Sequence, residues 1–456
     1  MARHTTRHGL DLPLAGSPEQ SIDAARQVTR VAVMADDFVG MKPTMHVREG
    51  ESVRIGQLLF EDKKTPGVRH SSPGAGKVVA VHRGERRALE SVVIELSSAD
   101  IGGRGDAVRF SSFTNKHPGS LGRDQVRDLL VESGAWVALR RRPFSRVPDP
   151  QGQPEALFIT VTDSHPQAPD PAVVLADRGA DFERGVAALA KLTSGPVFVC
   201  TRPGLQPPLP SSESIRVEEF DGPHPAGTAG YQIHTLHPAG RQHEVWWVDY
   251  PEVIAIGKLF ATGELDVERV VSLAGPSVRR PRLLRTRVGA WLDEVVRGEL
   301  AEGDHRVISG SVLTGRQAQG PELGYLGRRH RQVSVLPEGR KRELLGWLAP
   351  GLSSFSVTSA YLSKLVPGKR FAMDTSTNGS PRAIVPIGVY EKVFPFDIPP
   401  TALLRALAMQ DIEQAERLGV LELDEEDLGT CSFVCPGKHE YGLYLRNLLT
   451  TIEKEG

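Results

Sequence analysis

The chain has 456 residues, of which 24% are charged, and its 55 Lys and Arg against 56 Asp and Glu give a formal net charge of −1. The balanced charge lacks the basic excess typical of nucleic-acid-binding proteins and so argues against that class. Three cysteines are too few for a disulfide framework and indicate a reducing compartment. The N-terminus lacks the apolar core of a signal peptide, and no apolar run approaches the ~20 residues that span a bilayer.

The pattern predicts an α+β protein of several domains. Gly 46 and Pro 34 favour many turns and short strands. We place the domains at residues 1–110, 111–265, 266–350 and 351–456.

Residues 1–30 are polar and are expected to form an irregular arm laid over a domain. Residues 31–96 predict a compact β unit, because the run from Val47 to Leu59 reads V-x-E-G-x-x-V-x-x-G-x-x-L. Its glycines suit tight turns, and the alternating Val and Leu fill an interior. This is the pattern of a biotinyl/lipoyl-type barrel-sandwich.

Carrier domains of that type hold a modified lysine at a tight hairpin tip, and Lys63 and Lys64 occupy the corresponding region. The six residues from Thr65 to His70 separate these lysines from the next predicted strand, so the tip is not tight. We therefore favour a structural barrel with a long basic loop over a carrier domain.

Residues 111–265 alternate predicted strands and helices, which indicates a Rossmann-like α/β domain with a mostly parallel sheet. Cys200, at the end of one strand, is interpreted as a core residue. Helices are predicted at Arg123–Glu132, with Gly134 as its C-cap, and at Phe182–Leu192. Strands are predicted at Ala156–Val161, Ala172–Leu175, Pro196–Cys200, Glu244–Tyr250 and Leu259–Leu265.

The loop from Phe220 to Gly230 is the candidate ligand site, with Gly222, His224, Gly227 and Gly230 as its residues. Gly-rich loops between a strand and a helix of an α/β sheet commonly bind ligands. The spacing is not G-x-G-x-x-G, so a structural turn is the alternative.

No catalytic residue and no metal site is assigned, because the histidines that follow this loop have no zinc-like spacing with any cysteine. These histidines are His234, His237 and His243.

Residues 266–350 predict a β-grasp domain in the order strand, strand, helix, strand. Further strands are expected between 331 and 390. The predicted elements are Val270–Pro276, Arg282–Val288, the helix Leu292–Val296, Arg306–Gly315 and Gln332–Leu336.

The C-terminal residues 351–456 hold a faint internal repeat, in which Pro395 and Pro436 are 41 residues apart. The second copy, Cys431 to Pro436, reads C-x3-C-P, the tail of the bacterial ferredoxin motif whose thiolates hold iron–sulfur clusters. Of the eight cluster-ligand positions only Cys431 and Cys435 are Cys. The other six are Ile384, Ile387, Tyr390, Phe394, Glu425 and Leu428. We predict a helical, ferredoxin-like region without clusters, and the plainer reading is that the two cysteines are small buried helix residues.

Several multi-residue runs resemble the A subunit of the Na+-translocating NADH:quinone reductase (Na+-NQR), a family that is similar to the C subunit of the Rnf complex. The runs are Asp11–Gly16, Val39–Met45, Phe60–Lys64, Pro66–Val68, Leu421–Leu428, Thr430–Lys438, Glu440–Gly442 and Ile452–Gly456. The resemblance implies a peripheral subunit on the cytoplasmic face of the bacterial inner membrane, with a soluble-ligand-binding β-grasp module.

The resemblance also implies partners and cofactors. The partners are the other subunits of the complex, chiefly an integral membrane subunit, with quinone as a further candidate and no nucleic acid. The complex uses NADH, flavins, iron–sulfur centres, ubiquinone and Na+.

In related flavoproteins a Gly-rich loop that cradles FMN stands where this chain has Ala135–Ser145. Bulky side chains replace those glycines, so no FMN is expected. The triplet Arg140, Arg141 and Arg142 is interpreted as a solvated basic edge, with an anion site as the alternative.

The expected function is therefore that of a docking subunit without its own redox centre, which contributes to quinone reduction or access. The alternative is an independent nucleotide- or flavin-binding oxidoreductase that uses the 220–230 loop.

Overall fold

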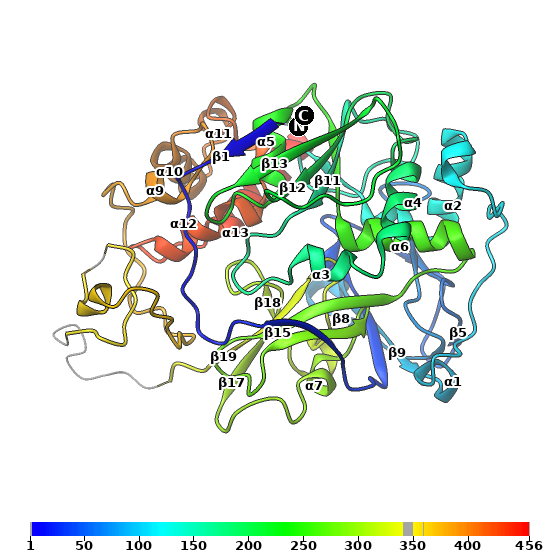
Figure 1. Ribbon diagram of the computed structural model, residues 1–456, viewed down its shortest axis with the longest axis horizontal. Coiled ribbons are helices and arrows are strands. Elements are labelled where there is room, and N and C mark those ends of the chain that lie inside the picture. The colour runs from blue at the N-terminus through cyan, green and yellow to red at the C-terminus, as the bar shows by residue number, and fades with distance from the viewer. Residues whose placement is uncertain (1, 341–349, 359, 456) are drawn as a thin grey trace.

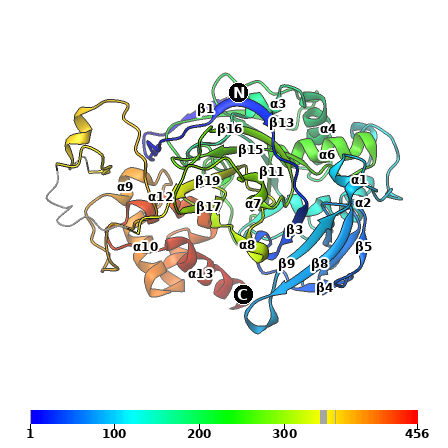
Figure 2. The ribbon, with the colours of Figure 1, turned by 90° about the horizontal axis from the view of Figure 1, so that it is seen from below.

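The computed structural model describes residues 2–340, 350–358 and 360–455 (Figure 1). Two six-stranded sheets and two smaller sheets make up its β structure. In Figures 1 and 2, strand β5 lies toward one end of the long axis, with β8 and β9 between it and the middle, and the C-terminal helices α9, α10 and α12 lie toward the other end.

Residues 30–96 form two small antiparallel sheets, which confirms the predicted β unit. Alternating apolar side chains, among them Val31, Val78 and Ile94, are buried and share one core with the neighbouring β-grasp sheet. The strands, in sheet order, are β3 (Arg30–Met34), β9 (Leu89–Leu96), β8 (Gly76–Arg83) and β5 (Ser52–Val53), then β4 (Pro43–Met45), β6 (Leu58–Asp62) and β7 (Arg69–Ser71).

A six-stranded sheet lies at the centre of the second unit, and all its neighbouring strands pair in parallel except the last pair. This confirms the predicted mostly parallel sheet. Its strands, in order, are β1 (Ala2–Thr5), β13 (Ile215–Asp221), β12 (Val197–Thr201), β11 (Ala156–Val161), β14 (Val245–Asp249) and β10 (Arg140–Arg142).

Alternation along β11 sends apolar side chains to both faces of this sheet, as expected for a strand buried on both sides. Leu157 and Ile159 pack with helices on one face, whereas Phe158 packs with α5 and the C-terminal helices on the other. The helices here are α2 (Arg123–Ser133), α3 (Pro171–Leu175), α4 (Gly179–Leu189), α5 (Ala229–Leu236) and α6 (Tyr250–Thr262).

The third unit confirms the predicted strand, strand, helix, strand order of a β-grasp. Strand β15 pairs antiparallel with β16 and parallel with β19. Its elements, with the sheet in order, are β18 (Arg316–Gln317), β17 (His305–Ser309), β19 (Gln332–Pro337), β15 (Glu268–Ala274), β16 (Arg282–Arg287) and β2 (Glu19–Ala24), with helices α7 (Leu292–Val295) and α8 (Gly320–Leu323).

The N-terminal arm is not irregular, contrary to expectation. Strand β1 adds to the edge of the α/β sheet beside β13, and β2 adds to the edge of the β-grasp sheet beside β16. The arm therefore joins two sheets that are formed otherwise from residues 140–337.

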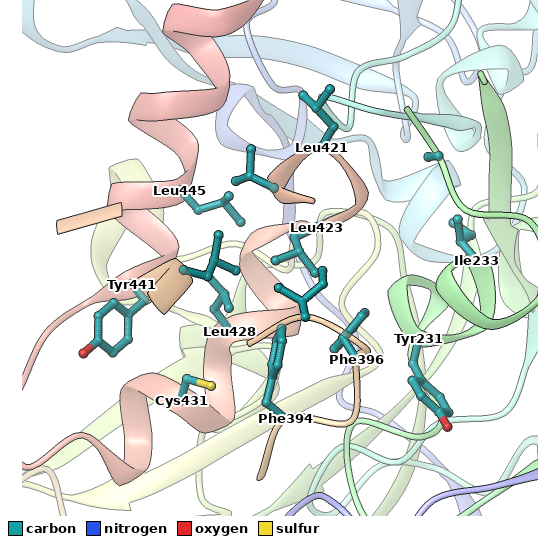
Figure 3. Packing of buried hydrophobic residues seen from close by; sticks show 14 of the residues in the cluster. Tyr231, Ile233, Phe394, Phe396, Leu421, Leu423, Leu428, Cys431, Tyr441 and Leu445 are labelled. Atoms are coloured by element: carbon teal, nitrogen blue, oxygen red, sulfur yellow. The ribbon is translucent and has the colours of Figure 1, made fainter. Parts of the chain in front are cut away.

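C-terminal helices cover the α5 face of the α/β sheet. Figure 3 shows Tyr231 and Ile233 of α5 facing Phe396 and its neighbours in this apolar cluster. The elements are α9 (Tyr390–Val393), α10 (Pro400–Met409), α11 (Ile412–Arg417), η7 (Val420–Glu422), η8 (Glu425–Leu428), α12 (Gly429–Val434) and α13 (Tyr441–Glu455).

Three strand predictions were wrong. Residues 172–175 belong to helix α3, and residues 259–262 belong to helix α6. Between 338 and 389, the described residues contain the short 3-10 turn Leu362–Leu365 and no strand, while residues 341–349 and 359 lie outside the described part.

Candidate functional site

The predicted ligand loop follows β13 at the carboxyl end of the parallel strands and leads into α5. The N-terminal arm covers it. Gly222 has a φ of +137°, and a Cβ there would lie 2.5 Å from the carbonyl oxygen of Thr6. The His224 carbonyl accepts a hydrogen bond from the Leu10 amide, and Asp11 accepts one from the His224 amide.

His224 is fully buried and packs among polar side chains from the end of β11. Its Nδ1 lies 3.0 Å from Ser164 Oγ, which also accepts a hydrogen bond from the Gly227 amide. The ring lies 4.5 Å from that of His165. Burial, with the neighbouring His165, holds the pKa of His224 well below its usual range, so the ring is neutral at physiological pH.

Gly230 stands where another segment of the chain approaches closely. A Cβ at this position would lie 2.0 Å from Oδ1 of Asp427, which is on η8. The structure thus holds the four predicted residues in one loop that contacts the arm, Ser164 after β11, and the C-terminal region. Ligand binding there is tested by none of these contacts and stays a prediction.

The basic triplet is not a solvated edge. It forms strand β10, and the side chains of Arg140 and Arg142 are fully buried. Arg142 Nη1 donates to the Glu422 carbonyl at 2.8 Å and to Asp427 Oδ2 at 3.1 Å. Arg142, together with the ion pair between Arg141 and Glu453, therefore ties the α/β sheet to the C-terminal region.

Asp424 and Asp427 lie beside this buried arginine, and Arg446 pairs with Asp424 and its neighbour Glu425. Asp424 Oδ2 lies 3.5 Å from Arg142 Nη2, and Arg446 makes ion pairs with Asp424 at 3.0 Å and Glu425 at 2.5 Å. Arg142 holds the pKa of Asp424 well below its usual range against the effect of burial. Burial raises the pKa of Asp427 and that of Glu425, each to about 7.

A cleft lies where the barrel-sandwich, the α/β sheet and the β-grasp meet. Its volume is about 490 Å³, including the part open to solvent. The lining is mostly apolar and comes from distant parts of the chain, as shown by Val33, Phe38, His70, Val137, Leu265 and Arg328. The sequence pattern did not indicate this site, although Phe38 stands directly before one of the family-like runs.

His70 is a buried polar residue that lines the cleft. Its ring stacks on Phe60, with centroids 4.4 Å apart, and meets the edge of Phe38 at 4.3 Å. Neither ring nitrogen has a hydrogen-bond partner among the described residues. Burial and the positive charges of Arg328 and Arg140 lower the pKa of His70 to about 3, so it is neutral.

The two C-terminal cysteines are free thiols buried in the helical region. Cys435 Sγ accepts a hydrogen bond from the hydroxyl of Tyr390 at 3.1 Å and lies within hydrogen-bonding distance, 3.4 Å, of the Tyr441 hydroxyl. Despite burial, these bonds lower the pKa of the Cys435 thiol, whereas burial raises that of Cys431 above its usual range. The third cysteine, Cys200, is buried on β12, in agreement with its interpretation as a core residue.

No helix in the described ranges 2–340, 350–358 and 360–455 combines the length and apolarity needed to cross a membrane.

Three family models match the chain. They are described as the NqrA N-terminal barrel-sandwich hybrid domain, matching residues 4–97, the NqrA second alpha/beta domain, matching 121–265, and the NQRA C-terminal domain, matching 270–320. These matches agree with the barrel-sandwich and α/β units, and with the β-grasp unit over most of its strands.

Curated relatives match over nearly their whole length, and each is described as the A subunit of the Na(+)-translocating NADH-quinone reductase. The protein from Hahella chejuensis is 53% identical over 450 residues, covering 99% of both chains. The protein from Vibrio atlanticus is 51% identical over 452 residues, covering 99% of this chain and all of the relative, and that from Pseudomonas aeruginosa is 51% identical over 450 residues, covering 99% of both.

Proposed function

The chain belongs to the family of the A subunit of the Na+-translocating NADH-quinone reductase. From this premise we propose that it is a peripheral subunit that docks on the membrane subunits from the cytoplasmic side. We also propose that it carries no redox centre of its own. The translocase of which it is a part oxidises NADH and reduces quinone. We retain the four-part division at residues 110, 265 and 350 as part of this proposal.

One observation carries the docking role. Large exposed apolar side chains are concentrated in the segment 352–387, which projects at one end of the molecule (Figure 1). Exposed apolar surface of this kind marks interaction sites. The large apolar side chains exposed in this segment are Leu352, Leu362, Leu365, Val366, Val385 and Ile387.

Charge substitution in this segment tests the docking role. Leu365→Glu combined with Val366→Glu is expected to lower recovery of the chain with the membrane subunits after detergent solubilisation, because a charged surface opposes burial. Met409→Glu is the matched control, since Met409 is 80% exposed but lies on α10, outside the segment. Equal recovery of the two variants would exclude this segment as the docking surface.

The absence of clusters is supported by what occupies the ferredoxin ligand positions. In two-cluster ferredoxins the fourth Cys of one motif completes the cluster of the other. Here Tyr390, the third position of the first copy, contacts Cys435, the fourth position of the second. In the other half, Figure 3 shows Cys431 and Leu428 beside Phe394. We infer a ferredoxin-like arrangement whose cluster space is filled by aromatic and aliphatic side chains.

The absence of flavin is supported by the segment around β10. Bound FMN phosphate needs close approach of backbone amides, whereas the buried guanidinium groups of Arg140 and Arg142 occupy this segment and donate to carbonyls and a carboxylate. Iron, sulfide and flavin analysis of the purified chain tests both absences. A stoichiometric chromophore, or bleaching of NADH by the chain alone, would instead favour an independent oxidoreductase.

The three-way cleft favours a second role, in quinone access. A quinone head is a flat ring with two carbonyl acceptors, and the cleft offers the Phe38 ring beside His70, whose ring nitrogens have no partner in the described part of the chain. In the purified complex, Phe38→Ala and His70→Ala are each expected to weaken binding of a short-chain ubiquinone about tenfold. His46→Ala, at an exposed histidine outside the lining, is the control. Unchanged affinity in both cleft variants would refute this role.

A further inference from the structure

The fold brings together three side chains that are distant in sequence at the amino end of the parallel sheet. His237 Nε2 and His243 Nδ1 lie 3.1 and 3.0 Å from the same oxygen, Glu155 Oε2. The ligand atoms of all three residues lie within 4.8 Å of one another. Two imidazoles and one carboxylate form a donor set that binds zinc, with water at the fourth position.

We propose that Glu155, His237 and His243 bind one divalent transition-metal ion of the zinc class. Tetrahedral coordination with bonds of about 2.1 Å separates the ligand atoms by about 3.4 Å. The present separations to Glu155 Oε2 therefore need to open by only a few tenths of an ångström. The bound ion takes the place of the ring protons that now point at the carboxylate.

Main-chain hydrogen bonds hold the backbone of all three residues in place. The Glu155 amide donates to the carbonyl of Glu244, the residue after His243, at 2.9 Å. Gly240 and His243 exchange two backbone hydrogen bonds across a tight turn. The amide of His237, which caps the end of α5, donates to Ile233 at 2.9 Å. Such a frame lowers the ordering cost of binding an ion.

The site is open to solvent, which gives an ion a path of entry. Glu155 and His243 are exposed and His237 is partly buried. The sequence predicted no metal site because these histidines have no zinc-like spacing with any cysteine. In the folded chain their partner is instead a carboxylate, Glu155, which lies 82 residues before His237.

An ion bound here would link three segments of the backbone to one another. Glu155 directly precedes β11, His243 lies just before β14, and His237 ends α5. The turn between the histidines also contacts the C-terminal region, because Arg241 pairs with Glu416 at 2.6 Å. The ion is therefore expected to stabilise the folded chain.

The test uses the full chain without a histidine tag, made metal-free and titrated with Zn2+ by calorimetry and with Co2+ by visible absorption. Wild type is expected to bind one equivalent with a dissociation constant below roughly 1 μM. Glu155→Gln, His237→Ala and His243→Ala should each weaken binding about tenfold or more and lose the Co2+ absorption bands. Zn2+ should raise the unfolding temperature of wild type more than that of these three variants.

His46→Ala is the matched control, because His46 is an exposed histidine that faces a single carboxylate, Glu61, at 3.6 Å. It should bind Zn2+ as wild type does. Metal-free unfolding temperatures equal to that of wild type would show that the variants are folded. The proposal is overturned if wild type binds no more tightly than His243→Ala, if binding needs millimolar metal, or if His46→Ala weakens binding equally.

Discussion

Arg142 is the buried link between the α/β sheet and the C-terminal region, so its removal gives a direct test of how these parts are held together. Methionine at this position would keep much of the volume but would remove the bonds to Glu422 and Asp427 at 2.8 and 3.1 Å. Breaking a buried ion pair from one side typically costs about 3–5 kcal/mol, because the partner charge is left uncompensated. We expect Arg142→Met to lower the free energy of unfolding by about this amount at pH 8.

The loss should depend on pH. Burial raises the pKa of Asp427 to about 7, and the carboxylates of Glu426 and Asp424 add to the shift. For an acid whose folded pKa is raised, the stabilising contribution is complete below the unfolded pKa of 3.8 and is lost as pH rises through about 7. At about pH 5.5 Asp427 is largely protonated in wild type as well as in the variant, so less charge is left uncompensated by the substitution and the cost should fall to roughly half.

Urea unfolding followed by tryptophan fluorescence measures this, since Trp246 and Trp247 lie on β14, the strand paired with β10. Arg141→Met is the control, because the ion pairs of Arg141 are partly exposed and such pairs contribute about 0–1 kcal/mol. Adding Asp427→Asn to Arg142→Met should restore part of the stability. A loss no larger than that of Arg141→Met, or equal at both pH values, would refute the reasoning.

Three further outcomes are expected. Gly257→Ala should destabilise the chain by at least about 1–3 kcal/mol, because a Cβ there would lie 1.7 Å from the Asp181 carbonyl between α6 and α4. Gly240→Ala is the control, since a Cβ there meets nothing within 4 Å among the described residues. The urea midpoints of the two variants are compared. Since the folded pKa of His70 is about 3 against 6.5 unfolded, stability should fall as pH drops from 6.5 toward 3, and His70→Phe should flatten that slope. Deleting residues 2–7 removes β1 and should speed proteolysis beside β13, which limited digestion would show.

Much of the secondary structure could be predicted because its periodicity is clear. Strand β11 was predicted over Ala156–Val161 and helix α2 to within a residue of its end. The wrong strand predictions fell on apolar runs whose pattern fits a helix as well as a strand. The run at 172–175 is a short helix, signalled by Asp170 as N-cap and Pro171 in the first turn. The apolar end of α6 is buried between α4 and the sheet, where periodicity does not separate helix from strand.

The sites were harder to predict than the strands. The loop at 222–230 could be selected as a candidate because its glycines and prolines lie close together in sequence, and its ligand binding stays a prediction. The cleft could not, since its lining joins Phe38 and His70 to residues near 265 and 328, and only the packing of three units makes them neighbours. The burial of Arg140 and Arg142 was missed for a related reason: their carboxylate and carbonyl partners lie in segments up to 285 residues away.

The way the arm bridges two sheets has a consequence for the order in which the chain can fold. Residues 2–24 leave the ribosome long before their strand partners, because β1 waits for residues near 218 and β2 for residues near 282. Contacts so far apart in sequence form late and slowly. The turn at His224, held by amides and carbonyls of this arm, is therefore expected to settle only after most of the chain has been synthesised.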